Sequence, residues 1–197
     1  PINSEKFSPK EGDFNGCIEC NFVLFLQACV REGFHVMATC LTAEGMKKFV
    51  ESFENGDSKL IRGRRRVHTF LGDLTNSETV AKLVAKVNKL VSNENKDTGG
   101  GENDCRMILH GLVNNAGICI PGRTDWMPLS TYQKQFSVNF FTTVDLTSRL
   151  IPTLKKFQGR IVNVSSVVGM VATVGLGAYS ASKFAIEGYS DALRCEL

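Results

Sequence analysis

The sequence has no long apolar run and almost no imbalance of charge. Its longest apolar stretch is Phe22 to Leu26, far short of the roughly 18 apolar residues that a membrane-spanning helix needs. Residues 1–6 are mostly polar, so we expect no secretory signal peptide. The formal net charge of +3 over 197 residues is too small to indicate a nucleic-acid partner. These absences favour a cytoplasmic protein without a membrane span.

Paired cysteines and metal-binding patterns are scarce as well. The seven cysteines are irregularly spaced, and several lie in apolar stretches, which favours reduced thiols over a disulfide framework. Cys17 and Cys20 form the single Cys-x-x-Cys pair, so we expect no four-cysteine zinc site and no other metal. Because such a pair at a helix start is also the arrangement of thioredoxin-type redox sites, a redox function stays open as an alternative.

Patterns of apolar residues predict an alternation of helices and strands. Thr42 and Asn76 stand where they would cap amphipathic helices, and Gly33 stands where it would end one. We expect helices over Phe22–Val30, Thr42–Phe53, Ser77–Val91, Ser130–Leu150 and from Ala178 onwards, with Pro152 beyond the fourth. We expect strands over His35–Cys40, Val67–Leu71, Met107–Val113 and Ile161–Val164.

This alternation indicates an α/β protein whose parallel, doubly wound sheet has helices on both faces. Residues 1–14 are mostly polar, so we expect a tail there and one domain over residues 15–197. The basic run Arg62–Arg66 and the polar, glycine-rich stretch 93–104 are expected to be loops.

One pair of residues has the chemistry of an acid–base site. Tyr179 and Lys183 lie four residues apart on a predicted helix and so share one face. A nearby ammonium lowers the pKa of a tyrosine, which suits proton transfer between an alcohol and a carbonyl. Ser166 follows the strand Ile161–Val164, at the sheet edge where active sites of this fold class gather. Its hydroxyl could hold a substrate oxygen, although Ser165 offers an equally good one.

A second group of small and polar residues follows another predicted strand. Asn114-Asn115-Ala116-Gly117 comes directly after Met107–Val113. Small residues there would let a ligand approach the backbone, although the same residues could form a plain turn. If the strands are parallel, this segment and Ser166 lie at the same edge of the sheet.

Together these motifs resemble the short-chain dehydrogenase/reductase family. The matching residues are Asp73-Leu74, Asn114–Gly117, Asn139, Ser166 and Tyr179–Lys183. The stretches Gly33–Thr42 and Ser190–Arg194 look in particular like the retinol dehydrogenase and 17β-hydroxysteroid dehydrogenase subgroup. The resemblance covers roughly residues 15–197 and implies a Rossmann-like NAD(P)-binding domain.

The resemblance also implies a role for each matching residue. Tyr179 would be the proton donor and acceptor, while Lys183 would lower its pKa and bind the nicotinamide ribose. Ser166 would orient the substrate oxygen, and Asn139 would hold the water of a proton relay. The cofactor would be bound by Gly16, Asp73, Leu74, Asn115, Ala116, Gly117, Tyr179 and Lys183. Taken alone, Asp73 could be a helix cap, and Asn139 an exposed polar residue.

The sequence departs from the family pattern at its first glycine-rich turn. Gly16 is kept, but Cys20 and Phe22 stand where the family has glycines that admit the cofactor's pyrophosphate. The first and last strands of the family's sheet have no counterpart in these 197 residues. We therefore expect a partial Rossmann-like domain, with the first strand and the last strands missing.

Two functions follow from this resemblance. The first is an oxidoreductase that transfers a hydride between NAD(P) and an apolar, retinoid- or steroid-like alcohol or carbonyl compound. NAD is expected, with NADP as the alternative, since Cys40–Thr42 has neither an acidic residue for a ribose nor an arginine for a 2′-phosphate. The second is a catalytically impaired, truncated relative that acts as a binding or dimerising module.

Two expectations about assembly and location come from the resemblance as well. A homodimer would form through the last helix, whose apolar face comprises Phe184, Ala185, Gly188, Tyr189 and Ala192. Attachment to the endoplasmic reticulum is the alternative to a cytoplasmic location.

Overall fold

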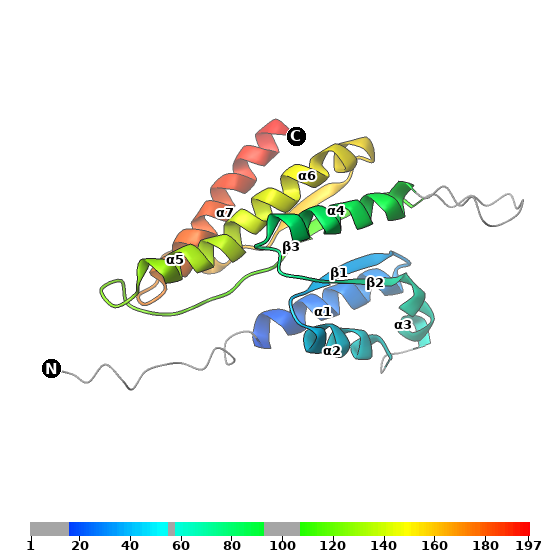
Figure 1. Cartoon of the computed structure of the whole chain (residues 1–197), viewed down its shortest axis with the longest axis horizontal. Coiled ribbons are helices and arrows are strands. Elements are labelled where there is room, and N and C mark those ends of the chain that lie inside the picture. The colour runs from blue at the N-terminus through cyan, green and yellow to red at the C-terminus, as the bar shows by residue number, and fades with distance from the viewer. Residues whose placement is uncertain (1–15, 55–57, 93–106) are drawn as a thin grey trace, which may run out of the picture. The chain divides into compact units, whose positions relative to one another are not determined.

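The computed structural model describes residues 16–54, 58–92 and 107–197 (Figure 1). The predicted tail over residues 1–14 and the predicted loop over 93–104 lie outside these ranges. The chain divides into two compact units, Pro1–Thr69 and Phe70–Leu197. The expectation of a single domain from residue 15 stays a prediction, and each unit is described by itself.

The first unit packs three helices with one pair of strands. Its apolar core consists of Leu26, Val30, Val36, Ala38, Phe49 and Phe53. Strands β1 and β2 form a two-stranded sheet, and β2 ends just past the boundary between the units. The elements are α1 (Gly16–Arg31), β1 (Val36–Cys40), α2 (Ala43–Glu54), α3 (Ser58–Gly63), the 3₁₀ turn η1 (Arg64–Arg66) and β2 (Val67–Leu71).

Both predicted helix boundaries of this unit are confirmed. Gly33 ends α1 with φ at +94°, and the Phe34 N–H donates to the Cys29 carbonyl at 3.0 Å. At the start of α2, the Gly45 N–H donates to Thr42 Oγ1 at 3.0 Å, which satisfies a donor that a helix start otherwise leaves unpaired.

Within the described residues, the second unit packs four α-helices, a π-helix and a 3₁₀ turn with a second pair of strands. Strands β3 and β4 pair in parallel, with Gly111 opposite Arg160 and Asn114 opposite Asn163. Helix α4 packs on α6, and α5 and η2 pack along α7 (Figure 1). The elements are α4 (Ser77–Ser92), β3 (Gly111–Asn114), α5 (Leu129–Phe136), the π-helix η2 (Ser137–Phe141), α6 (Thr142–Lys156), β4 (Arg160–Asn163), the 3₁₀ turn η3 (Val167–Gly169) and α7 (Gly177–Glu196).

The strands confirm an α/β fold with an incomplete sheet. Among the described residues no strand precedes α1, and the four strands form two separate pairs, β1–β2 and β3–β4.

The helical stretch expected over Ser130–Leu150 is confirmed as α5, η2 and α6 in unbroken succession. Three local predictions were wrong. Pro152, which was expected beyond this stretch, lies inside α6. A proline removes one helical hydrogen bond, but Leu150 and Leu154 on either side are each only 3% exposed, and their burial holds the helix. The basic run Arg62–Arg66 is the end of α3 followed by η1 rather than a loop. The strand expected over Met107–Val113 begins only at Gly111.

Neither a membrane span nor a metal cluster was found in the part of the chain that the structure describes. No described helix is long and apolar enough to cross a bilayer. No group of three or more potential metal-ligating side chains occurs among the described histidines, cysteines and carboxylates.

Candidate active site

A buried amide network fixes the strand ends from which the candidate site emerges. Asn114 ends β3, is 8% exposed, and donates through Nδ2 to Asn163 Oδ1 at 2.8 Å and Thr147 Oγ1 at 2.9 Å. Asn163 in turn donates to Ser190 Oγ at 2.8 Å. These bonds tie β3 to β4, α6 and α7. The segments that follow the two strands therefore start from fixed positions.

The first two turns of α7 carry the predicted acid–base pair. Tyr179 is 8% exposed and Lys183 is 5% exposed. Lys183 Nζ donates to the Val164 carbonyl at 2.8 Å and lies 5.7 Å from the centroid of the Tyr179 ring. The helical spacing thus brings the two side chains together, as the sequence predicted.

The structure distinguishes between the two candidate serines. The Ser166 hydroxyl lies close enough to the Tyr179 hydroxyl to lower its pKa. Ser165 Oγ is buried and has no hydrogen-bond partner among the described residues. It faces Gly169, where an added Cβ would lie 2.8 Å from Ser165 Oγ and 3.1 Å from Lys183 Cβ. Of the two serines, Ser166 is the one whose hydroxyl affects Tyr179. Gly169 lets η3 pack closely on α7.

The pKa values at this pair differ in direction from the sequence-based expectation. Burial raises the pKa of Tyr179 above its usual value and outweighs the effect of the Ser166 hydroxyl, which lowers it. Burial also lowers the pKa of Lys183. We expected Lys183 to lower the pKa of Tyr179. In this arrangement its ammonium instead bonds the Val164 carbonyl, so desolvation of the phenol dominates.

Asn139 lies inside the π-helix η2 and is buried, at 1% exposed. The Ile118 N–H donates to Asn139 Oδ1 at 2.7 Å, and Asn139 Nδ2 donates to the Ile118 carbonyl and to Ser182 Oγ, both at 2.9 Å. The interpretation of Asn139 as an exposed polar residue is therefore wrong. Its role in holding a water of a proton relay stays a prediction.

Gly117 lies between Asn139 and Lys183. A Cβ added there would lie 3.5 Å from Asn139 Oδ1 and 3.6 Å from Lys183 Nζ. Asn115 and Ala116 precede it after β3, and Ala116 is exposed. The structure therefore brings together Gly117, Asn139 and Lys183, with Tyr179 and Ser166 beside them.

The predicted adenine-contact residues lie at the start of α4. Asp73 Oδ1 accepts hydrogen bonds from the Thr75 N–H at 2.9 Å and the Thr75 hydroxyl at 2.7 Å. The cap of α4 is instead Asn76, which accepts from the N–H groups of Glu78 and Thr79. Asp73 therefore closes the turn before the helix, and its proposed contact with adenine stays a prediction.

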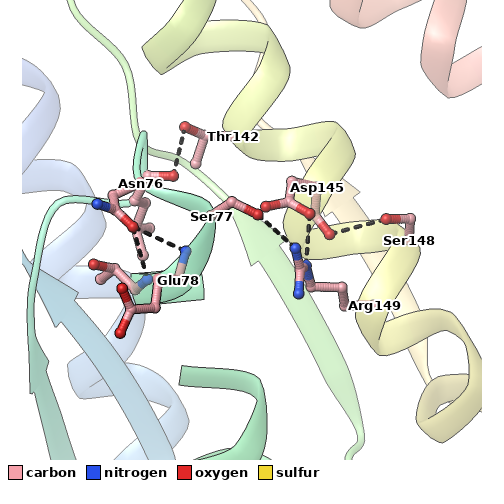
Figure 2. Close-up of polar contacts among 9 residues, drawn as sticks. Asn76, Ser77, Glu78, Thr142, Asp145, Ser148 and Arg149 are labelled. Atoms are coloured by element: carbon pink, nitrogen blue, oxygen red, sulfur yellow. Dashed lines mark hydrogen bonds and ion pairs between the residues drawn. The ribbon is translucent and has the colours of Figure 1, made fainter. Parts of the chain in front are cut away.

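This turn is fixed to α6 by polar contacts (Figure 2). Thr142 Oγ1 donates to the Leu74 carbonyl at 3.2 Å. Arg149 donates to Ser77 Oγ and to Asp145 Oδ1, both at 2.6 Å. The turn that contains Leu74 is thereby bonded to Thr142, three positions after Asn139 in the same helical run.

Gly16 is the one predicted site residue that belongs to the first unit. It is the first residue of α1, and the helix is continuous through Cys20 and Phe22. Phe22 is half-buried and packs against the core of that unit. The segment expected to form a glycine-rich turn is therefore part of a helix.

The sequence analysis missed two residues beside the predicted site. Gln135 is fully buried and bonds the backbone of Ile120. Cys119 is half-buried and close enough for its charge to affect the pKa values of Tyr179 and Lys183. The spacing of Gln135 four residues before Asn139 was the available signal, because such residues share a helix face.

The sequence profile of the short chain dehydrogenase family matches residues 25–197. The chain belongs to this family. Retinol dehydrogenase 16 of Mus musculus is 34% identical over 183 residues, which are 92% of this chain and 50% of the relative. The 17-beta-hydroxysteroid dehydrogenase type 6 of Bos taurus is 37% identical over 166 residues, 84% of this chain and 45% of the relative. The chain thus spans about half the length of these curated relatives.

Solved structures of short-chain dehydrogenases share the fold. A variant of actinorhodin polyketide ketoreductase, solved with NADPH, aligns with a TM-score of 0.71 and 22% identity. The alignment covers 88% of this chain and 59% of the ketoreductase. At this level of identity the similarity concerns the fold alone.

The residues of the chain fit one end of a nicotinamide cofactor better than the other. An ammonium has three donors, so Lys183 retains donors for ribose hydroxyls beyond its bond to Val164. Gly117 and the exposed Ala116 leave the backbone beside it uncovered by large side chains. The pyrophosphate end fits poorly, because Cys20 and Phe22 are helical residues of α1 rather than glycines of a turn.

Proposed function

We propose that this chain is an oxidoreductase that transfers a hydride between NAD(P) and an apolar alcohol or carbonyl compound. The observation that carries the proposal is the buried pair Tyr179 and Lys183, whose Nζ lies 5.7 Å from the tyrosine ring, with Ser166 close enough to affect the pKa of Tyr179. The nicotinamide supplies or accepts the hydride when it is bound. The residues of the chain manage the proton and the positions of the reacting groups.

Tyr179 is the proton donor and acceptor in this proposal. Because burial raises its pKa, its side chain is a neutral phenol at neutral pH, which is the form that gives a proton to a carbonyl oxygen. Oxidation needs the phenolate form, which takes the alcohol proton. The rate of oxidation should therefore increase relative to the rate of reduction as the pH rises. Ser166 holds the substrate oxygen at Tyr179, and the ammonium of Lys183 binds ribose hydroxyls.

The proposal of an apolar substrate is supported by the side chains next to this site. Ser166 and Tyr179 bound a loop that is paired with the segment after β3, since the Gly122 N–H donates to the Gly175 carbonyl at 2.8 Å. Exposed apolar side chains that lie together are typical of binding sites. The exposed apolar residues of the two segments are Trp126, Leu129, Val167, Met170, Val171 and Val174.

The two relatives give the substrate classes to test, a retinoid and a steroid. Turnover of retinol and of a secondary hydroxysteroid is measured by NADH or NADPH formation with each cofactor. Tyr179→Phe should lower kcat by about 100-fold or more, the usual contribution of a general acid–base group. The matched control is Tyr189→Phe, which removes a half-buried hydroxyl from the same helix.

Wild-type turnover that is lost in Tyr179→Phe and kept in Tyr189→Phe would support the proposal. A folded wild-type chain that turns over neither substrate with either cofactor would contradict it. Equal rates in Tyr179→Phe and the wild type would contradict the assigned role of Tyr179.

A second proposal, a binding or dimerising module, is favoured by the continuous helix α1. This helix passes through Cys20 and Phe22, where a pyrophosphate would need a glycine turn. A homodimer through α7 would use Phe184, which is 45% exposed. Light scattering after gel filtration should then give a dimer that Phe184→Asp dissociates and that Leu41→Asp, at a 69% exposed residue of the first unit, leaves intact. A monomeric wild type would refute the dimer.

A further inference from the structure

Gln135 is a completely buried glutamine, with 0% of its surface exposed. Its amide makes two hydrogen bonds to one residue. The Ile120 N–H donates to Gln135 Oε1 at 3.0 Å, and Gln135 Nε2 donates to the Ile120 carbonyl at 3.3 Å. A buried amide needs partners for its donor and its acceptor, and here one backbone unit satisfies both.

Asn139 makes the same pair of bonds two residues earlier, to the N–H and the carbonyl of Ile118, at 2.7 and 2.9 Å. Alternate residues of an extended chain direct their N–H and C=O groups to the same side. Residues four apart on a helix also share one side. Gln135 and Asn139 together therefore bond the segment Ile118–Ile120 much as a neighbouring strand would.

Cys119 lies between the two bonded residues and next to the acid–base pair. Burial raises the pKa of its thiol, whereas the ammonium of Lys183 lowers it by a smaller amount. A thiolate at Cys119 would in turn raise the pKa of Tyr179. The segment that the two amides hold is thus within electrostatic reach of both catalytic candidates.

We propose that Gln135 is a positioning residue of the candidate active site, acting through the backbone of Ile120. Its neutral amide, together with Asn139, fixes the path of Ile118–Ile120 and thereby the place of Cys119 beside Tyr179 and Lys183. An apolar residue of similar size would satisfy neither Ile120 group. A carboxylate would accept from the Ile120 N–H but would repel the Ile120 carbonyl. The catalytic consequence rests on the proposed oxidoreductase function, whereas the positioning of Cys119 does not.

The first test measures the rate at which iodoacetamide alkylates Cys119, followed by mass spectrometry of the peptide that contains it. Gln135→Leu should raise this rate about tenfold relative to the wild type, because two backbone groups lose their partners and the segment opens more often. Gln133→Glu is the matched control for Gln135→Glu, since it makes the same change at an exposed glutamine of the same helix. This control should leave the rate unchanged.

Gln135→Glu should make the alkylation rate of Cys119 depend on the protonation of residue 135. Such a dependence is not expected if the Gln135 side chain only fills space. A protonated carboxyl has one donor and one acceptor, like the amide, so it can restore both bonds to Ile120. The ratio of mutant to wild-type alkylation rates should be near one at low pH and rise about tenfold as the carboxyl ionises. The pH dependence of Gln135→Glu also tests the positioning role if Gln135→Leu fails to fold. A ratio that does not change with pH would overturn the proposal.

The enzymatic readout separates this proposal from the proposed function. In a wild type that turns over substrate, Gln135→Leu should lower kcat while the Kd for NADH stays within about twofold of the wild-type value. Equal losses in kcat and in folded fraction would reduce Gln135 to a structural role and refute positioning. If the wild type binds neither NADH nor NADPH, the oxidoreductase proposal fails, and the alkylation series still tests whether Gln135 positions the segment Ile118–Ile120.

Discussion

Replacing Asn139 with alanine should lower the free energy of unfolding by about 2–3 kcal/mol. The substitution removes the partners of the Ile118 N–H and the Ile118 carbonyl. A buried polar group without a partner costs roughly 1–3 kcal/mol, and these two groups are only partly buried, so we take the lower half of that range. Alanine returns about 0.6 kcal/mol through its better helix propensity. Ser182 Oγ keeps its bond to the Tyr179 carbonyl.

Urea unfolding followed by circular dichroism measures this loss. The matched control is Asn88→Ala, the same substitution in another helix, where the asparagine makes one half-buried bond to Thr153. Both variants replace the same side chain within a helix, so the comparison removes most of the change in helix propensity. We expect a loss below about 1 kcal/mol for Asn88→Ala. If Asn139→Ala lost no more than this control, Asn139 would not fix the segment that contains Ile118.

Three further outcomes follow from the structure. Phe53→Ala should cost about 3–5 kcal/mol in a thermal or urea unfolding assay, because Phe53 is fully buried and packs edge-to-face on Phe49; a loss under 1 kcal/mol would contradict this packing. Gly33→Ala should cost about 1 kcal/mol through backbone strain alone, since φ is +94° and no atom lies within 4 Å of the added Cβ, and Gly33→Asn should recover part of that loss. Lys183→Met should slow alkylation of Cys119 at a given pH near 8, because it removes the ammonium that lowers the thiol pKa; an unchanged rate would place the two groups farther apart.

Local signals in the sequence were sufficient for most elements. Thr42, Asn76 and Gly33 mark helix ends because capping and positive φ depend on single residue types, and all three act as predicted. Strand β2 was predicted at its observed bounds, Val67–Leu71. The π-helix was not predictable, because an i to i+5 bond pattern has no periodicity of its own in five residues.

The site was predictable in its residue types but not in its electrostatics. The spacing of Tyr179 and Lys183 follows from helix geometry, so their proximity could be read from the sequence. The direction of the Tyr179 pKa could not, since it depends on burial and on Lys183 bonding the Val164 carbonyl. Gln135 was missed because its burial depends on its two bonds to the Ile120 backbone, and only its spacing four residues before Asn139 pointed to the same helix face.

The binding of a nicotinamide cofactor is the most direct test of this assignment. Nicotinamide fluorescence is followed while NADH or NADPH is titrated into the wild type, Lys183→Met and the exposed-lysine control Lys89→Met. We predict saturable binding that Lys183→Met weakens by about tenfold or more, the loss expected for a charged hydrogen bond, and that Lys89→Met leaves unchanged. Absence of binding to a cooperatively folded chain, or equal binding by Lys183→Met and the wild type, would contradict the proposed cofactor site.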